Sequence, residues 1–248
     1  YNAGPVEFLV AGEEIYFLEM NTRIQVEHPV TELVTGLDLV ALQIRIAGGE
    51  KLPISQKDVS FTGHAIEYRI NAEDATKGFT PATGKIEQIV RPKASFVRED
   101  YGYESGDEVS AYYDGMLSKL IVYGESREQA LTRSAHVLFQ YRIAGLPTTL
   151  PFHRWLLDDQ RFSDSGVDIG FVEREFRPEE IQDFVDPMDG SQSTEAVCPV
   201  ELYSYWSQKY QYQYRVEILQ SSCGVFVATP LAENYTRCLL YTSPSPRD

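Results

Sequence analysis

The sequence predicts an α+β fold in which antiparallel strands are flanked by helices. Short runs of alternating apolar and polar residues between 64 and 123 are typical of half-buried strands separated by turns. Residues 6–18 have the pattern of a β-hairpin, and 31–47 and 126–141 carry helical signals. The 248 residues, of which 43% are hydrophobic, are enough for one or two packed domains.

The first expected elements are two strands, 6–10 and 15–18, joined by a turn at residues 11–14. A single helix is expected over 31–47, ended by Gly48 and its neighbouring glycine. Four apolar residues at helical spacing support this helix: Leu33, Leu37, Val40 and Ile44.

Two further helices are expected after the strands. Ser126 and Gln129 form a capping-box signal for a helix that reaches about Tyr141. Pro151 is suited to the first turn of a short helix that ends near Leu157, because proline has no amide proton to leave unsatisfied there.

The last third of the chain changes in composition. Residues 176–200 hold six acidic residues against one arginine, with three prolines, and are expected to be an acidic linker. Residues 201–237 are expected to be a truncated β-rich segment of unassigned identity. This expectation depends on tyrosines that recur at period two: Tyr203, Tyr205, Tyr210, Tyr212 and Tyr214.

The last eleven residues, 238–248, match the translation of a common transposase sequencing adapter. We therefore expect this tail to be an artefact whose removal changes neither stability nor binding. The alternative is that Leu239, Leu240 and Tyr241 attach to exposed strand edges.

The charge and the scattered cysteines and histidines exclude several classes of function. A formal net charge of −15 argues against a nucleic-acid partner. The three Cys and four His lack the spacing of a metal site or a disulfide framework. No apolar run approaches the ~20 residues of a membrane helix, and no signal peptide is evident, so we expect no membrane association and a cytoplasmic location.

One polar face is expected along residues 18–27, where every odd position is polar: Glu19, Asn21, Arg23, Gln25 and Glu27. In an extended chain, alternate side chains share a face. Glu7, from the preceding strand, can add a carboxylate beside Glu19. Carboxylate and amide oxygens suit Mg²⁺, and Arg23 offers a bidentate fork for an oxyanion. An ordinary solvated strand face is the alternative at this point.

A second polar face alternates in the same way along Glu67, Arg69, Asn71 and Glu73. A solvated edge with an internal Glu–Arg pair is again the alternative. The sequence has neither a P-loop motif nor a dinucleotide-binding glycine motif after a strand, which excludes those two nucleotide-binding classes.

The run FLEMNTRIQVEHPVTE at 17–32 resembles the signature of biotin carboxylases, members of the ATP-grasp superfamily. Residues 17–24 alone also resemble the carbamoyl-phosphate synthetases, whereas the segments 25–29, 68–74 and 112–116 favour biotin carboxylases. The resemblance extends from Tyr1 to about Arg174. It departs from the family pattern in the run PVEF at 5–8, where a bulkier residue often precedes the Glu, and at Gly115, where Ser is common. Neither departure changes a proposed catalytic side chain.

This resemblance implies the end of an ATP-grasp domain over 1–62 and a biotin carboxylase C-terminal domain over 63–175, an antiparallel sheet with flanking helices. It also implies a metal site for Mg²⁺ or Mn²⁺ beneath the phosphates of ATP. The residues carried over to that site are Glu7, Glu19 and Asn21, the two glutamates reaching ATP through the metal.

The remaining roles carried over from the family concern bicarbonate and biotin. Arg23, Gln25 and the backbone of Val26 would hold bicarbonate. Glu27 would be the base that deprotonates it. Arg69 would contact bicarbonate and the ureido oxygen of biotin, and would stabilise the enolate form of biotin.

The function implied is ATP- and Mg²⁺-dependent carboxylation of biotin with bicarbonate, through carboxyphosphate, within an acetyl-CoA, propionyl-CoA or pyruvate carboxylase. The implied partners are a carboxyltransferase subunit and a biotin carboxyl carrier domain or protein, and a homodimer is compatible with the family. The family's N-terminal domain and ATP lid would precede Tyr1, so we expect this chain alone to be an inactive fragment. The alternatives are another ATP-grasp ligase, such as a carbamoyl-phosphate synthetase, and a non-catalytic scaffold, whose polar side chains would diverge.

Overall fold

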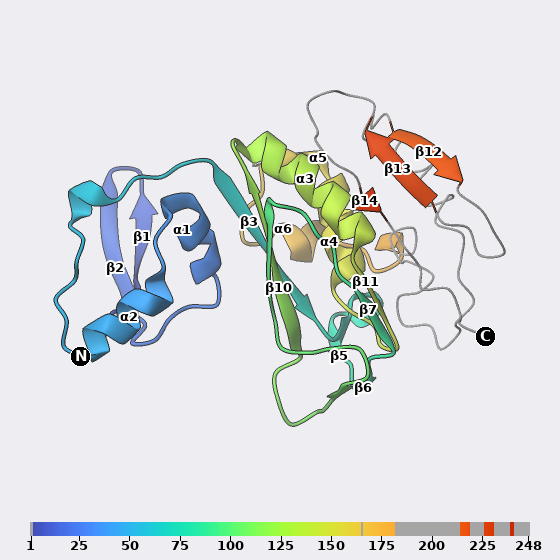
Figure 1. Ribbon diagram of the computed structural model, residues 1–248, viewed down its shortest axis with the longest axis horizontal. Coiled ribbons are helices and arrows are strands. Elements are labelled where there is room, and N and C mark those ends of the chain that lie inside the picture. Colours follow the sequence, from blue (N-terminus) through green and yellow to red (C-terminus); the bar gives the residue numbers. More distant parts are fainter. Residues whose placement is uncertain (1, 165, 182–213, 219–225, 231–238, 241–248) are drawn as a thin grey trace. The chain divides into compact units, whose positions relative to one another are not determined.

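The computed structural model describes residues 2–164, 166–181, 214–218, 226–230 and 239–240 (Figure 1). The chain divides into two compact units, the first of which contains the described residues up to Ile181 and every predicted site residue. In the part of the chain that the structure describes, no helix combines the length and the apolar character needed to cross a membrane.

The first unit begins with the expected hairpin. Strand β1 (Val6–Ala11) pairs with β2 (Glu14–Met20) in antiparallel register. The turn between them uses Gly12 at φ +66°, a left-handed conformation that glycine adopts without steric cost. Large apolar side chains are exposed along both strands.

The single helix predicted over 31–47 is wrong, because two helices occupy this segment. Helix α1 (His28–Thr35) ends at Gly36, which has φ +72°, and α2 (Leu39–Ala47) begins after it. The left-handed glycine terminates the first helix. The Asp38 side chain then caps the second by accepting a hydrogen bond from the backbone N–H of Ala41 (2.8 Å).

A three-stranded antiparallel sheet in the order β3-β10-β8 forms the centre of the region that follows (Figure 1). Its strands are β3 (His64–Asn71), β10 (Met116–Gly124) and β8 (Val97–Tyr101), as the alternation predicted. Helix α3 (Arg127–Gln140) packs against β10 and β3. The buried side chains of Tyr68, Ile70 and Leu120 lie on alternate positions of these two strands. The polar side chains of Glu67 and Arg69 therefore lie on the opposite face.

The helices after the sheet begin where the sequence indicated. The Ser126 side chain accepts from the backbone N–H of Gln129 (3.2 Å) and caps α3. Helix α4 (Leu150–Asp158) carries Pro151 in its first turn. Phe176 and Ile181, at the start of the expected acidic linker, are buried, whereas residues 182–200 lie outside the described part.

Smaller elements complete the first unit. They are η1 (Gln56–Asp58), β4 (Glu73–Asp74), η2 (Ala75–Lys77), β5 (Thr80–Pro81), β6 (Gly84–Lys85), β7 (Gln88–Val90), β9 (Glu108–Val109), β11 (Arg142–Ala144), α5 (Gln160–Ser163) and α6 (Phe171–Glu175). Three two-stranded pairings join β4 to β5, β6 to β9 and β7 to β11.

The second unit contains a three-stranded antiparallel sheet in the order β12-β13-β14. Its strands are β12 (Tyr214–Ile218), β13 (Phe226–Pro230) and β14 (Leu239–Leu240). Of the alternating tyrosines, Tyr214 begins β12 and the others lie outside the described residues. Strand β14 pairs with β13 and belongs to the tail that matches an adapter. This pairing is the strand-edge attachment named above as the alternative, and the expectation for the tail stays a prediction.

Candidate active site

Three predicted metal ligands converge at the open end of the hairpin. Glu7 and Glu19 are directly opposed partners in the β1–β2 register. The Nδ2 of Asn21 donates to Glu7 Oε1 (2.8 Å) and to Glu19 Oε1 (3.2 Å). The backbone N–H of Asn21 donates to the carbonyl of Pro5 (3.0 Å), which fixes the end of β2 beside the start of β1.

The donor set of this cluster fits a hard divalent cation. Two carboxylates and one amide oxygen are the ligand types that Mg²⁺ accepts, usually together with water or phosphate oxygens. The amide of Asn21 presents its N–H₂ group to the two carboxylates, and with a cation between them it would present Oδ1 instead. Among the described residues, no three His, Cys, Asp or Glu side chains gather as a metal site. A cation bound at this cluster would therefore need the amide oxygen of Asn21 and oxygens from a substrate as further ligands.

The residues that follow the cluster form a loop, not the continuous strand expected over 18–27. Strand β2 ends at Met20, and the segment then turns into α1. The His28 backbone N–H (3.3 Å) and Nδ1 (2.7 Å) both contact the carbonyl of Gln25, which closes the turn before Pro29. The period-two pattern did not predict this turn, because the polar side chains do not share one strand face but bond to different neighbouring strands: Gln25 bonds to Glu7 on β1, and Glu27 bonds to β3.

The loop brings one of the predicted bicarbonate ligands, Gln25, into contact with the metal cluster, and Arg23 lies in the same loop. The side-chain amide of Gln25 donates to Glu7 Oε1, the same oxygen that accepts from Asn21. Arg23 is exposed, and its Nη1 donates to the carbonyl of Ile24 (3.1 Å). This contact is local, so the guanidinium group has donors left for an anion.

Glu27 and Arg69 form an ion pair between the loop and β3. Arg69 Nη2 lies 2.8 Å from Glu27 Oε2, and the two side chains are 48% and 51% exposed. Glu27 occupies the N-cap position of α1 without capping it through its side chain. Because exposed ion pairs contribute only about 0–1 kcal/mol to stability, this one leaves both groups free to exchange partners.

The backbone around Arg69 is fixed from the side of β3 that β10 does not cover. The hydroxyl of Thr149 donates to the carbonyl of Arg69 (2.9 Å) and accepts from the backbone N–H of Asn71 (3.0 Å). The backbone N–H of Thr149 donates to the carbonyl of Asn71 (3.0 Å). His153 Nε2 also contacts the carbonyl of Arg69 (2.9 Å). Burial lowers the pKa of His153 to about 4, so its ring is neutral near pH 7 and can donate through Nε2.

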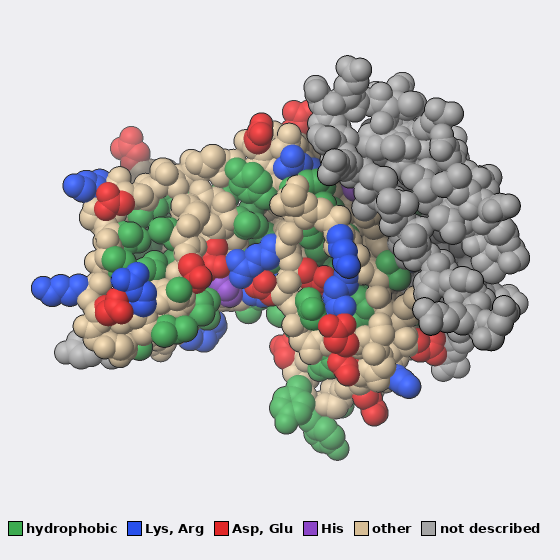
Figure 2. Space-filling view, viewed as in Figure 1, with side chains coloured by type: hydrophobic (Ala, Val, Ile, Leu, Met, Phe, Trp, Pro, Cys, Tyr) green, Lys and Arg blue, Asp and Glu red, His purple; other side chains and the backbone are tan. Residues whose placement is uncertain are grey.

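Two charged residues behind this pair were not assigned a role from the sequence. Lys119 Nζ donates to the carbonyl of Val26 (3.0 Å) and lies 3.5 Å from Asp100 Oδ2. Glu67 lies on β3 with its side chain only 5% exposed. Burial raises its pKa, an effect that the nearby charges of Lys119 and Arg69 oppose. Figure 2 shows acidic and basic side chains side by side where α1 approaches the sheet.

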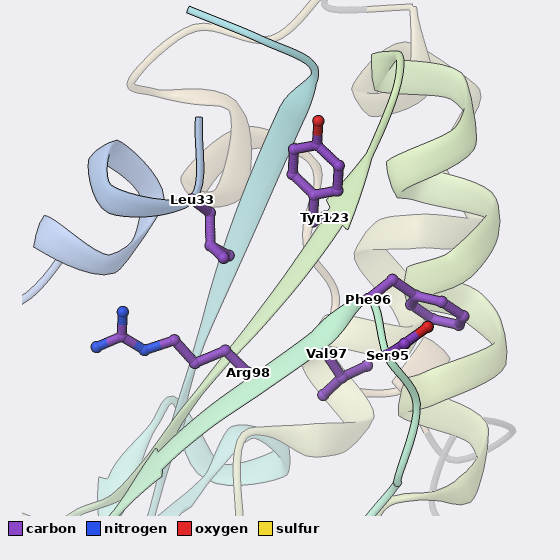
Figure 3. Close-up of a pocket in the computed structure, with 6 residues that line it drawn as sticks. All are labelled: Leu33, Ser95, Phe96, Val97, Arg98 and Tyr123. Atoms are coloured by element: carbon purple, nitrogen blue, oxygen red, sulfur yellow. The ribbon is translucent and has the colours of Figure 1, made fainter. Parts of the chain in front are cut away.

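A shallow cavity of about 160 Å³ lies elsewhere, between α1 and the edge of the sheet (Figure 3). Its lining contains no predicted site residue: Leu33, Ser95, Phe96, Val97, Arg98 and Tyr123. Arg98 is held there by Glu32 (2.6 Å) and by Asp100 (2.8 Å).

Comparison with known proteins identifies this arrangement. Residues 1–55 match the family described as "Carbamoyl-phosphate synthase L chain, ATP binding domain", and residues 67–174 match "Biotin carboxylase C-terminal domain". The fold and these two matches define the ATP-grasp superfamily. Within that superfamily, this part of the chain belongs to the biotin carboxylase family, as the resemblance indicated.

Curated relatives and solved structures agree. A pyruvate carboxylase subunit of Methanothermobacter thermautotrophicus is 48% identical over 172 residues, which are 69% of this chain and 35% of that protein. Biotin carboxylase of Haemophilus influenzae is 46% identical over 172 residues, 69% of this chain and 38% of that protein. The chain spans about a quarter to two fifths of the curated relatives it matches.

One similar structure is the biotin carboxylase domain dimer of Hydrogenobacter thermophilus 2-oxoglutarate carboxylase, in complex with MgADP, ADP and bicarbonate. It is 42% identical with a TM-score of 0.69, and the match covers 75% of this chain and 40% of that chain. The biotin carboxylase subunit of a pyruvate carboxylase matches with 43% identity and the same TM-score. The predicted α+β fold is therefore confirmed.

Proposed function

We propose that residues 1–175 contribute to a biotin carboxylase site that uses ATP, Mg²⁺ and bicarbonate to carboxylate biotin on a carrier domain or protein. The observation that carries this proposal is that two groups of side chains converge at the two ends of the loop that joins β2 to α1. Glu7, Glu19 and Asn21 gather at its start, and Glu27 pairs with Arg69 at its end. Similar proteins whose names include biotin carboxylase and pyruvate carboxylase support the assignment.

The residues of the chain suit the first step, attack of a bicarbonate oxygen on the γ-phosphorus of ATP to give carboxyphosphate and ADP. A bound Mg²⁺ would neutralise phosphate charge at the hairpin cluster. Arg23, Gln25 and the Val26 peptide would hold the anion. Glu27 would accept the bicarbonate proton, which requires that the carboxylate first release Arg69.

Arg69 would then act in the second step, in which the carboxyl group of carboxyphosphate passes to the ureido nitrogen of biotin, phosphate is released, and the proton of that nitrogen is taken up by the phosphate. Negative charge develops on the ureido oxygen as the nitrogen becomes nucleophilic. A guanidinium group held in advance near that oxygen stabilises the charge without reorganisation. The fixed backbone of Arg69, bonded to Thr149 and His153, is suited to this task.

The test is a comparison of variants in the full-length protein. Arg23→Ala, Glu27→Ala and Arg69→Ala should each lower biotin carboxylation by about 10²–10³, the usual loss for one preorganised charge-stabilising group. Arg69→Ala should lower bicarbonate-dependent ATP hydrolysis less than biotin carboxylation. Arg45→Ala is a matched control, because Arg45 is 49% exposed and pairs with Glu50 at 2.7 Å in an ion pair outside the site. Near-normal turnover of Glu27→Ala and Arg69→Ala would refute the proposal.

Partners and location belong to the same proposal. Biotin carboxylation requires a biotin carboxyl carrier, and a carboxyltransferase would afterwards transfer the carboxyl group from biotin to the final substrate. A relative described as the small subunit of 2-oxoglutarate carboxylase supports a multi-subunit setting. A homodimer is supported by the dimeric domain among the similar structures. The predicted cytoplasmic location stays a prediction, since the plant relatives are described as mitochondrial. The convergent side chains disfavour the scaffold alternative. Residues 1–55 match a carbamoyl-phosphate synthase domain family, but the match of residues 67–174 to the biotin carboxylase C-terminal domain favours biotin carboxylase over a carbamoyl-phosphate synthetase.

A further inference from the structure

A buried carboxylate lies immediately behind the candidate site. Glu67 precedes Arg69 by two residues on β3, so both side chains are on the face opposite α3. The Glu67 side chain is 5% exposed, and neither of its oxygens accepts a hydrogen bond from the described residues. Burial of an ionised carboxylate is costly unless cations or donors compensate it.

Arg69 lies in ion-pair range of this carboxylate, whereas Lys119, whose ion-pair partner is Asp100 (3.5 Å), acts on it only through its charge. Arg69 Nε lies 3.9 Å from Glu67 Oε1, within ion-pair range but beyond a hydrogen bond. Lys119 stands opposite Arg69 in the β3–β10 register and lowers the pKa of Glu67 through its charge. On the side of the candidate site, Arg69 forms its ion pair with Glu27. Lys119 donates a hydrogen bond to the carbonyl of Val26.

The geometry also indicates why the Arg69 guanidinium needs a second carboxylate beside Glu27. The Arg69 guanidinium has five donors in a fixed fork, and Nη2 is used by Glu27 while Nε is directed at Glu67. Among the described residues, Glu27 and Glu67 are the carboxylates in ion-pair range of Arg69. When Glu27 releases Arg69 to act as a base, Glu67 remains to hold the guanidinium group.

We propose that Glu67 is a positioning residue: its buried carboxylate holds the Arg69 guanidinium from behind and thereby fixes it in the reaction site. This inference rests on the proposed function of Arg69 and goes beyond it by assigning a role to a group that touches no substrate. A shift of about 1 Å in the Arg69 side chain would bring Nε into hydrogen-bond range of Glu67.

The activity test uses Glu67→Gln in the full-length protein, because the amide keeps the shape of the side chain and removes its charge. We expect kcat/KM for biotin to fall at least about tenfold, with the melting temperature preserved. Glu67→Asp keeps the charge one methylene further back and should have an activity between those of Glu67→Gln and the wild type. Glu99→Gln is the matched control. Glu99 is a buried carboxylate, 8% exposed and paired with Arg91 (3.3 Å), and its substitution should leave kcat/KM unchanged.

A second readout is independent of turnover. The ¹H–¹⁵N signal of Arg69 Nε–H is followed by NMR in the 248-residue chain, assigned through Arg69→Lys. Glu67→Gln should shift this signal and speed its exchange with water at least about fivefold, whereas Glu99→Gln should not. A merely structural role for Glu67 would lower the melting temperature without moving this signal selectively.

The outcomes separate the inference from the function on which it rests. Full activity of Arg69→Ala would remove the proposed function whatever Glu67 does. Loss of activity in Arg69→Ala, with kcat and KM of Glu67→Gln within twofold of the wild type and an unmoved Arg69 signal, would overturn the inference alone. Equal activities of Glu67→Asp and Glu67→Gln would also overturn it, since the anchor is a charge.

Discussion

Thr149→Val tests whether one hydroxyl holds the end of β3 in place. Valine has nearly the shape of threonine, so the substitution removes hydrogen bonds with little change in volume. The Thr149 hydroxyl makes two such bonds, to the carbonyl of Arg69 (2.9 Å) and from the N–H of Asn71 (3.0 Å), and Thr149 is only 5% exposed.

The magnitude follows from which group is left without a partner. The Arg69 carbonyl keeps its contact with His153 Nε2, whereas the Asn71 N–H loses its acceptor. A buried donor left unsatisfied costs about 1–3 kcal/mol. For a chain of this size, each kcal/mol lowers the melting temperature by about 2–4 °C, so we expect a decrease of about 2–12 °C.

Thermal unfolding of the 248-residue chain, followed by circular dichroism or calorimetry, measures this effect. Thr149→Ser is the control, because it keeps the hydroxyl and loses only a methyl group. We expect the serine variant to be the more stable of the two. A valine variant that melts within about 1 °C of the wild type, or above the serine variant, would refute the reasoning.

Three further predictions concern the same unit. Gly145→Ala should destabilise it strongly, since the new Cβ would lie 2.3 Å from a backbone oxygen; Gly106→Ala, which also has positive φ but open space, should cost only about 1–2 kcal/mol in chemical unfolding. Arg154→Met should cost about 2–5 kcal/mol, because Arg154 is 3% exposed and donates to two backbone carbonyls, and urea midpoints would measure it. Burial lowers the folded-state pKa of His153 to about 4, below the value of about 6.5 in the unfolded chain. The contribution of the neutral ring to the free energy of unfolding is therefore full above about pH 6.5 and is lost as the pH falls toward 4. The stability difference between pH 7.5 and pH 4.5 should therefore shrink in His153→Gln, and an unchanged difference would contradict this sign.

Short-range sequence patterns, such as strand alternation and helix caps, predicted the helices and strands that depend on them. The alternating runs between 64 and 123 predicted antiparallel strands, among which are β3 and β10, and Ser126 predicted the start of α3. The helix over 31–47 failed because the apolar spacing continues across Gly36, whose left-handed backbone breaks the helix.

The sequence predicted the metal cluster of the hairpin more fully than the charged residues that support the Glu27–Arg69 pair. Glu7, Glu19 and Asn21 were brought together because a hairpin register follows from a short turn. The bond of Lys119 to the Val26 carbonyl joins residues 93 positions apart, and no period in the sequence encodes such a pairing. A signal for it existed nonetheless, because Lys119 is the only charged residue in the strand MLSKLIVYG.

The Glu27–Arg69 pair has a consequence for how such a protein can be recombined. Its two members come from segments that match two different families, residues 1–55 and 67–174. The boundary between the two modules therefore passes through the candidate active site. The bond from Lys119 to Val26 crosses the same boundary. A graft that exchanged either module for a homologue would have to preserve the docking of loop on sheet to within a fraction of an ångström. Exchanged modules can each fold normally and still give an inactive chimera. Compensating substitutions at residues 26–32 and on the exposed face of β3 are those expected to restore its activity.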